Sequence, residues 1–263
     1  MFTHLVIVPC HSIWKGGSSA GRDAKEWLLQ SYQMEGDDHL CFIDHLLKAA
    51  KVLKEDQYAL MIISGGKTCK EAGPISEADS YCKLLGEYTV AAISKSDYEE
   101  RVLLEPFAKD SFENVLFSIC RFYEVCGNYP SHITVCGFDF KRSRFVQLHL
   151  QLALKFEPTR VSYVGNYPMP KCDESQKELY YRVLKKGEEE NASRYFRNDL
   201  YGIQPPLSTK KELRNPFNQR HEYALTNPCL RFLFERMAQA DPDKLDFEKS
   251  QFPWNESFVA KKD

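Results

Sequence analysis

Three side chains beside predicted strands or a predicted helix could carry out acid–base chemistry. His11 follows the apolar run Leu5–Pro9, Glu105 follows the run Val102–Leu104, and Glu77 lies where a helix is expected to begin. Histidine titrates near neutral pH, and carboxylates clustered beside cations have shifted pKa values. We therefore predict His11, Glu77 and Glu105 as catalytic residues. The alternatives are a turn histidine bonded to the backbone and a solvated glutamate in a first helical turn.

A glycine-containing turn, Ser64-Gly65-Gly66-Lys67-Thr68, follows the apolar run Tyr58–Ile63. Two glycines permit positive φ and a close approach of the backbone, so several N–H groups can converge on an anion. A P-loop would need glycine where Met61 stands, which excludes that motif. The turn predicts a ligand-binding role for Ser64, Gly65, Gly66 and Lys67; the alternative is a tight turn without a ligand.

The segment Ser111-Phe112-Glu113-Asn114 opens a further predicted helix. A helix N-terminus has unpaired N–H groups and the positive end of the helix dipole, which suit a phosphate or carboxylate. We therefore expect Ser111, Glu113 and Asn114 to contact the ligand. The alternative for Glu113 is a capping box with Asp110.

Three cations, Lys141, Arg142 and Arg144, follow Gly137 near the first turn of another predicted helix. The helix dipole disfavours cations at that position, so an anion or carboxylate is expected to offset them. Lys141 and Arg144 share a face at i, i+3. We predict that Gly137, Lys141 and Arg144 bind the ligand; the alternative is a solvated basic face.

Several common types of functional site are excluded because their sequence motifs are absent. The seven histidines show no metal-binding spacing, so no metal ligand is predicted. Neither a G-x-S-x-G elbow nor a G-x-G-x-x-G dinucleotide fingerprint is present, and the first run ends in Pro9-Cys10-His11.

The elements that would position these residues alternate between short apolar runs and amphipathic helices. The runs are Leu5–Pro9, Tyr58–Ile63, Val102–Leu104, Ile133–Cys136 and Val161–Val164. Helical patterns cover residues 40–53, 76–86, 111–126 and 140–156, the last with Phe145, Leu148 and Leu152 facing inward. This order predicts an α/β fold: a Rossmann-like, open, mostly parallel five-stranded sheet with helices on both faces. Ligands of such sheets bind at the carboxyl ends of the strands, commonly at a switch point beside the first strand.

Composition narrows the class of protein. The 263 residues carry a net charge of −2, so we expect no nucleic-acid partner. No apolar stretch approaches the roughly 20 residues that span a bilayer, and the N-terminus has no basic region or cleavage site of a signal peptide. Nine cysteines without a C-x-x-C pair favour a reducing compartment. We expect a cytoplasmic protein, the alternative being association with an internal membrane through a segment absent from this sequence.

The chain divides into a predicted core, residues 1–170, and a C-terminal extension, residues 171–263. Residues 13–36 look like an insertion lying over the site edge. Residues 172–197 look helical and charged, and Pro205-Pro206, Asn215-Pro216, Asn227-Pro228 and Asp241-Pro242 then break the chain. We expect an irregular extension that wraps the core and contains one short helix over 228–240.

The series of a Ser-Gly-Gly turn, Ser76-Glu77-Ala78, Glu105, an S-x-E-N helix start and a basic Gly-Phe-x-Phe-Lys-Arg segment resembles the DUF218 (YdcF-like) family, in particular its eukaryotic, mainly fungal branch. The resemblance covers roughly residues 4–165. It implies a Rossmann-like fold, with charged residues at the sheet edge and an adenosyl-type ligand such as S-adenosylmethionine. The site residues that it implies are Ser64, Gly65, Gly66, Glu77, Glu105, Glu113, Asn114, Lys141 and Arg144. Gly137 with Lys141, and Pro9-Cys10-His11, depart from the bacterial pattern.

Three hypotheses follow from the sequence. The first is an enzyme acting on a small anionic metabolite that is nucleotide-like or phosphorylated. The second is a non-catalytic protein that binds an adenosyl ligand. The third is an interaction scaffold in which the charged edge forms a structural network under the extension.

Overall fold

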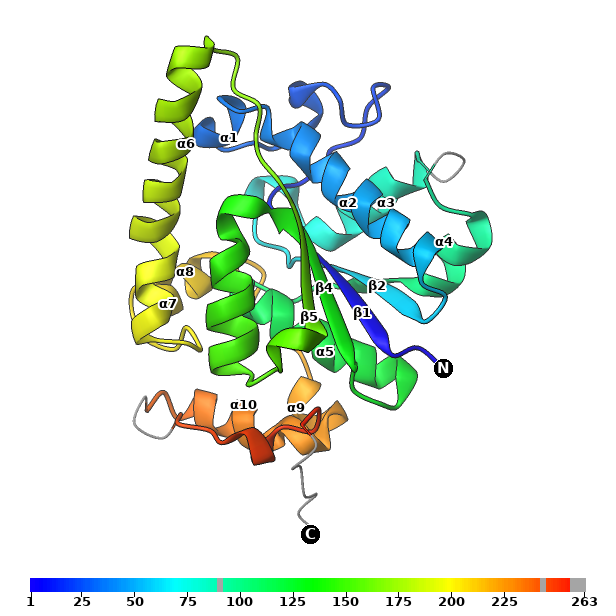
Figure 1. Ribbon diagram of the computed structural model, residues 1–263, viewed down its shortest axis with the longest axis vertical. Helices are drawn as coiled ribbons and strands as arrows, with labels where there is room; N and C mark the ends of the chain where they lie inside the picture. Colours follow the sequence, from blue (N-terminus) through cyan, green and yellow to red (C-terminus); the bar gives the residue numbers. More distant parts are fainter. Residues whose placement is uncertain (89–91, 242–244, 256–263) are drawn as a thin grey trace.

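The sheet has the predicted number and direction of strands. The computed structural model describes residues 1–88, 92–241 and 245–255. The strands are β1 (His4–Pro9), β2 (Ala59–Ser64), β3 (Val102–Glu105), β4 (His132–Phe138) and β5 (Val161–Asn166). They are all parallel, in the order β3-β2-β1-β4-β5, as Figure 1 shows. This confirms the Rossmann-like open sheet and places its switch point between β1 and β4.

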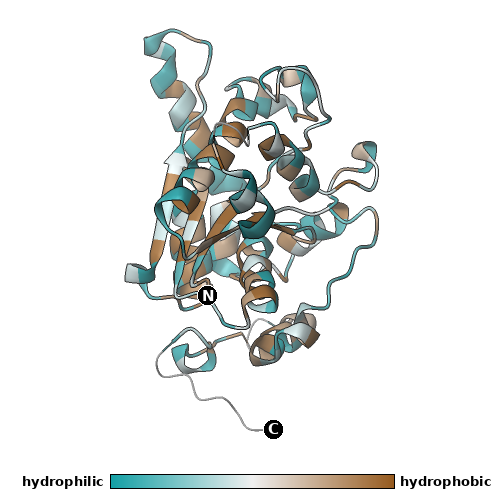
Figure 2. Ribbon diagram, turned by 90° about the vertical axis from the view of Figure 1, so that its right-hand side faces the viewer, coloured by the Kyte–Doolittle hydropathy of each residue, from teal (hydrophilic) through white to brown (hydrophobic). Residues whose placement is uncertain are grey.

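Successive residues of each buried strand point to opposite faces of the sheet, so each face has its own core. On one face Val6, Val8, Met61 and Ile63 join the helices α2 (Asp38–Glu55) and α3 (Glu77–Gly86). On the other face Leu5 and Ile7 join helix α5 (Ser111–Cys126) and later parts of the chain. In Figure 2 the strands are mostly brown, which is the hydrophobic end of the scale.

The helices follow the predicted spacing, with bounds that differ by a few residues. The helices that cross between strands are α2 (Asp38–Glu55), α3 (Glu77–Gly86), α4 (Lys95–Arg101), α5 (Ser111–Cys126) and η4 (Arg144–Ala153). Helix α3 begins at Glu77, as expected, and the Ser76 side chain caps it by accepting a hydrogen bond from Asp79 N.

Helix η4 differs from the prediction in its winding, which changes the residues that it buries. It is a π-helix, with i→i+5 hydrogen bonds. Phe145 and Leu148 are buried as expected, whereas the side chain of Leu152 is 49% exposed. His149 and Ala153 take its place in the core, because more residues per turn move the inward face forward along the sequence.

Residues 13–36 pack beside the end of β1. They include the helices η1 (Ala24–Glu26) and α1 (Ser31–Met34), and Trp14 pairs with Trp27 in an antiparallel bridge. Gln33 Nε2 donates to the His11 carbonyl at 3.0 Å, which fixes α1 beside the residue that follows β1. The segment, dark blue in Figure 1, therefore lies at the carboxyl edge.

The extension contains more helix than the sequence predicts. Its helices are α6 (Glu174–Glu188), η6 (Glu189–Ser193), α7 (Arg194–Asn198), α8 (Leu207–Leu213), α9 (Tyr223–Thr226), η7 (Pro228–Leu230), α10 (Arg231–Ala238) and η9 (Lys249–Gln251). Helices α8 and α9 were missed because each is short and lies between prolines. Residues 242–244 and 256–263 of the predicted extension lie outside the described residues.

The extension contributes to the core on the α5 face. Trp254 stacks on Phe156 with ring centroids 4.8 Å apart, and its Nε1 donates to the Leu154 carbonyl at 2.8 Å. Tyr223 lies 5.2 Å from Phe117, also between ring centroids. In the described parts of the chain, no helix is long and apolar enough to cross a membrane.

Candidate functional site

Six titratable side chains gather at the carboxyl edge of the sheet, around the switch point. We call them the edge cluster: His11, Asp38, Glu77, Lys141, Arg144 and Arg214. Lys141 lies close enough to act electrostatically on His11, Asp38 and Glu77, and Arg214 acts in the same way on His11, Glu77 and Lys141. The cluster therefore combines the end of β1, the starts of α2 and α3, the segment after β4, and the extension.

His11 is held as a neutral imidazole. Its ring lies 5.2 Å from Phe138 and 5.4 Å from Phe42, between ring centroids. Burial and then the charge of Lys141 hold the pKa of His11 well below its usual range. Its Nε2 is buried without a hydrogen-bond partner among the described residues. A buried nitrogen of this kind is available to a ligand, since leaving it unpaired costs free energy.

Glu77 is the first residue of α3 and is half-buried. Its Oε1 accepts a hydrogen bond from the Thr68 hydroxyl. Burial raises the pKa of Glu77 to about 7, against the opposing effects of the Thr68 hydrogen bond and the charge of Arg214. The carboxyl group can therefore take up or release a proton near neutral pH, which general acid–base catalysis requires.

Among the described residues, Lys141 is a cation without a carboxylate in ion-pair contact. Within the described residues its ammonium forms no hydrogen bond or ion pair, and it lies over the rings of Phe138 and Phe140 at 4.9 and 5.5 Å. Burial, followed by the charge of Arg144, lowers the pKa of Lys141 to about 8. An anion bound beside Lys141 would supply the missing counter-charge.

Asp38 and Arg214 belong to the cluster and were missed by the sequence analysis. Asp38 begins α2 and is 6% exposed, and its Oδ1 has no hydrogen-bond partner within the described chain. Burial raises the pKa of Asp38 to about 7, and Lys141 opposes this effect. Acidic residues at the start of the helix that follows the insertion were a usable signal for Asp38. Arg214 comes from the extension, and only the folded structure shows that it belongs to the cluster.

The Ser-Gly-Gly turn does not present its N–H groups to a ligand, contrary to our expectation. Gly65 N donates to the Glu105 carbonyl at 3.0 Å and Gly66 N to the Ala108 carbonyl at 2.8 Å, while Lys67 N donates to Gln219 Oε1 at 3.1 Å. Neither glycine has positive φ. The backbone of the turn instead packs closely against the neighbouring segments.

The two glycines are required by this close contact. A Cβ on Gly65 would lie 2.7 Å from the Cys10 Cβ, and one on Gly66 would lie 2.7 Å from the Ala108 carbonyl oxygen. The side chain of Lys67, which we expected to bind the ligand, has no hydrogen bond or ion pair within the described residues.

Glu105 lies beneath the cluster as part of a buried network. It is fully buried, and its carboxylate accepts hydrogen bonds from the Ser64 hydroxyl at 2.7 Å, from Phe107 N at 2.8 Å and from Tyr223 Oη at 3.3 Å. Asn114 Nδ2 donates to the carbonyl of Ser64 at 3.0 Å and to its Oγ at 2.9 Å. Burial raises the pKa of Glu105 to about 7, although the hydrogen bonds from the Ser64 hydroxyl, Phe107 N and Ala108 N favour the ionised form. Ser64, Glu105 and Asn114 therefore brace the strand ends.

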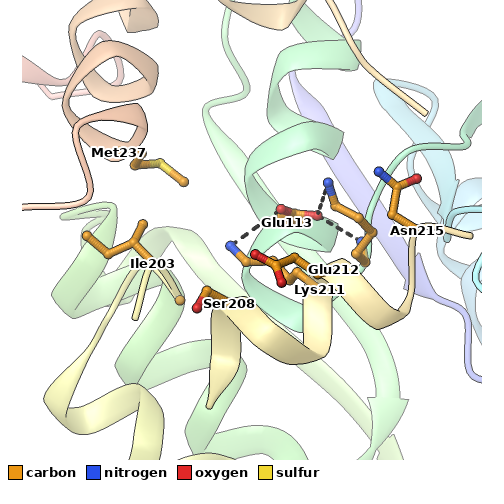
Figure 3. A pocket seen from close by; sticks show the side chains of 9 residues that line it. Glu113, Ile203, Ser208, Lys211, Glu212, Asn215 and Met237 are labelled. Atoms are coloured by element: carbon orange, nitrogen blue, oxygen red, sulfur yellow. Dashed lines mark hydrogen bonds and ion pairs between the residues drawn. The ribbon is translucent and has the colours of Figure 1, made fainter. Parts of the chain in front are cut away.

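The N-terminus of α5 is occupied by the protein's own carboxylates. Asp110 Oδ1 accepts from Glu113 N at 2.8 Å, so Asp110 caps α5. Glu113 Oε2 accepts from Lys109 N at 2.9 Å and not from Asp110 N, so the reciprocal capping box that was the alternative for Glu113 is not formed. Glu113 lines a separate pocket of about 250 Å³ between α5, α8 and α10, where it points toward Lys211, as Figure 3 shows. Helix α5 thus does not present a free N-terminus to an anion.

Ser111, Arg144 and Gly137 have internal contacts. The guanidinium of Arg144 is ion-paired with Glu188 of α6, with 2.7 Å between Nε and Oε1, and its Nη1 donates to Ser111 Oγ at 2.9 Å. Glu188 is therefore the carboxylate that we expected to offset the positive charge near the start of η4. Gly137 lies in β4, where a Cβ would meet Tyr163 Oη at 3.0 Å.

Within the described ranges, no group of three or more His, Cys, Asp or Glu side chains is placed to hold a metal ion.

These features define an all-parallel, doubly wound α/β protein with titratable groups at its switch point. The chain is 35% identical, over an alignment of 295 positions, to the uncharacterized protein YOR238W of Saccharomyces cerevisiae, and the alignment covers 95% of this chain and 97% of the yeast protein. The chain belongs to the same family as that yeast protein. No family model matches it, so the resemblance to DUF218 stays a prediction. No solved structure matches it either.

Proposed function

We propose that the protein is an enzyme that carries out acid–base chemistry on a small anionic, nucleotide-like metabolite bound at the edge cluster. The observation that supports this most is that Lys141, which forms no ion pair within the described residues, lies beside proton-carrying groups at the switch point. Perturbed titratable groups gathered in one place are typical of active sites.

In this proposal Lys141 and Arg214 bind the anion. Both are cations without a carboxylate partner in the described chain, and Arg214 Nη1 donates only to the Lys109 carbonyl, at 3.1 Å. These two side chains replace the turn, where Gly65 N, Gly66 N and Lys67 N are bonded internally, and the α5 N-terminus, which Asp110 caps.

Glu77 is the proposed general acid–base. Its carboxyl titrates near neutral pH, and His11 Nε2 is available to hydrogen-bond the substrate. Asp38 is a second carboxyl able to exchange a proton at neutral pH. Glu105 was expected to be catalytic, but its buried hydrogen bonds make it a positioning residue in this proposal, acting through Ser64 and the turn.

The proposed class of ligand includes adenosyl compounds, with S-adenosylmethionine as the cofactor that the DUF218 resemblance implies. We also propose that the protein works in the cytoplasm. All nine cysteines are free thiols, which suits a reducing compartment.

A thermal-shift screen tests this proposal. Wild type, Lys141→Ala and the exposed control Lys83→Ala would be screened with nucleotides, S-adenosylmethionine, S-adenosylhomocysteine and sugar phosphates. A ligand at 100 times its Kd adds about 2.7 kcal/mol to the free energy of unfolding, and thus raises the Tm by several degrees. We expect this shift in wild type and Lys83→Ala, and its loss in Lys141→Ala.

Turnover of the ligand found in this way separates an enzyme from a binding protein. Glu77→Gln should retain binding and lose turnover by roughly 100-fold or more. Binding that persists without turnover in wild type would favour the non-catalytic alternative. The absence of a shift with every compound would favour the scaffold alternative.

A further inference from the structure

A second, smaller cavity lies beside the edge cluster, where the extension meets the core. It encloses about 70 Å³, and its walls come from the start of α5, from η4, from the η6–α7 segment and from α8. Arg144 and Arg214 line it, and both also act electrostatically on Lys141 and His11. The cavity therefore adjoins the edge cluster.

Three cations line this cavity, and two of them have no carboxylate partner in the described residues. Lys210 Nζ donates to the Asn191 carbonyl at 2.8 Å, and Arg214 Nη1 donates to the Lys109 carbonyl at 3.1 Å. The third cation, Arg144, is paired with Glu188. The positive charges of Lys210 and Arg214 are therefore not neutralised within the cavity.

Among the described residues, Asp110 is the carboxylate that lines the cavity. Its Oδ1 caps α5 through Glu113 N at 2.8 Å, and its Oδ2 forms no hydrogen bond within the described chain but lies 3.7 Å from Lys211 Nζ on the other face of α8. Burial and the neighbouring charges of Arg214 and Arg144 lower the pKa of Lys210, as expected where positive charge is in excess.

We propose that this cavity binds the phosphate group of the ligand that occupies the edge cluster. The inference rests on the proposed function, because the cavity adjoins the proposed site. Its volume suits one small oxyanion and excludes a sugar or base ring. A guanidinium and an ammonium without carboxylate partners are the groups that bind phosphate in proteins.

Inorganic phosphate is the direct probe of this cavity. Its binding would be measured by phosphorus NMR at constant ionic strength, on wild type, Lys210→Gln, Arg214→Gln and the exposed control Lys83→Gln. We expect wild type and Lys83→Gln to bind equally. Lys210→Gln and Arg214→Gln should each weaken binding ~10-fold, since each removes a charge-assisted contact. Circular dichroism and urea unfolding would confirm that the variants are folded.

A matched pair of nucleosides distinguishes the phosphate of a ligand from free phosphate. Wild type should bind adenosine 5′-monophosphate ~10-fold or more tightly than adenosine, and Lys210→Gln should lose this preference. Phosphate binding that is equal in wild type and Lys210→Gln would overturn the cavity assignment. Phosphate binding without any preference for the monophosphate would overturn the assignment to a ligand's phosphate group.

The proposed function can be rejected independently of this inference. Lys141 does not line the cavity, so Lys141→Ala should retain binding of inorganic phosphate while weakening the binding of adenosine 5′-monophosphate. If wild type binds inorganic phosphate but no nucleotide or adenosyl compound, the assignment of the cavity to phosphate stands and the proposed ligand of the edge cluster is rejected.

Discussion

The hydroxyl of Tyr223 donates a hydrogen bond to Glu105 Oε1 at 3.3 Å, and so joins the extension to the end of β3. The same carboxylate accepts from the Ser64 hydroxyl at the end of β2. One buried side chain therefore connects two strand ends, the turn after β2 and the helix α9. Its loss is expected to affect the fold as well as the site.

Glu105→Gln is expected to lower the free energy of unfolding by about 1–3 kcal/mol, because the new amide N–H groups face donors and leave buried groups unpaired. Urea denaturation at pH 7 measures this change. Tyr223→Phe, which removes a single donor, should cost only about 0.5–1.5 kcal/mol. Unchanged stability with lost turnover in Glu105→Gln would instead make Glu105 a catalytic residue.

Gly65→Ala and Gly66→Ala are each expected to destabilise the protein by about 1–3 kcal/mol. The added Cβ would lie 2.7 Å from Cys10 Cβ in the first variant and 2.7 Å from the Ala108 carbonyl oxygen in the second. Gly187→Ala on α6 is the matched control, because its Cβ would meet no atom closer than 3.9 Å. It should be neutral or stabilising by up to about 1 kcal/mol. Thermal unfolding compares the three variants, and a stable Gly66→Ala protein would contradict the close contact.

Glu77 should make stability depend on pH. Its pKa rises from 4.5 to about 7 on folding, so folding takes up a proton between these values. Its contribution to stability is therefore full below about pH 4.5 and is lost as the pH rises through about 7. Between pH 5 and pH 8, wild type should lose about 1–3 kcal/mol that Glu77→Gln does not lose.

Urea denaturation at pH 5, 6, 7 and 8 measures this difference. Glu99→Gln, at an exposed carboxyl on α4, is the control and should follow wild type at every pH. A parallel dependence in wild type and Glu77→Gln would show that Glu77 does not hold its proton near neutral pH.

Trp254→Ala is expected to destabilise the protein by about 3–5 kcal/mol, because it removes a ring stacked on Phe156 and a buried hydrogen bond to Leu154. Trp254→Phe, which keeps a ring and loses the hydrogen bond, should cost less. Calorimetry reports both values. A small effect of Trp254→Ala would mean that residues 245–255 contribute little to the core.

The strands could be predicted because both faces of the sheet are buried, so each strand is an apolar run such as Leu5–Pro9. The edge at which His11, Glu77 and Lys141 meet follows from the parallel order of those runs. The direction in which a polar side chain points at a strand end does not follow from spacing. Glu105 and Glu77 look alike in sequence, yet one lies inside a closed network and the other in the edge cluster.

Sequence patterns also could not predict which distant segments contribute residues to the site. Lys210 lies on a seven-residue helix between prolines and Arg214 directly follows it, and nothing in the sequence shows which part of the core they meet. Leu152 was misplaced because α-helical spacing was assumed for a segment that winds as a π-helix.

The contacts of Tyr223 and Trp254 also bear on how the protein is made. Chains leave the ribosome N-terminal end first, so the whole sheet and α5 are synthesised before residues 223–254. During that interval Phe117 and Phe156 lack the rings that cover them in the finished molecule. Nascent cores with this apolar surface exposed can associate with one another or with chaperones. Translation that stops short of Trp254 should therefore yield an aggregating product.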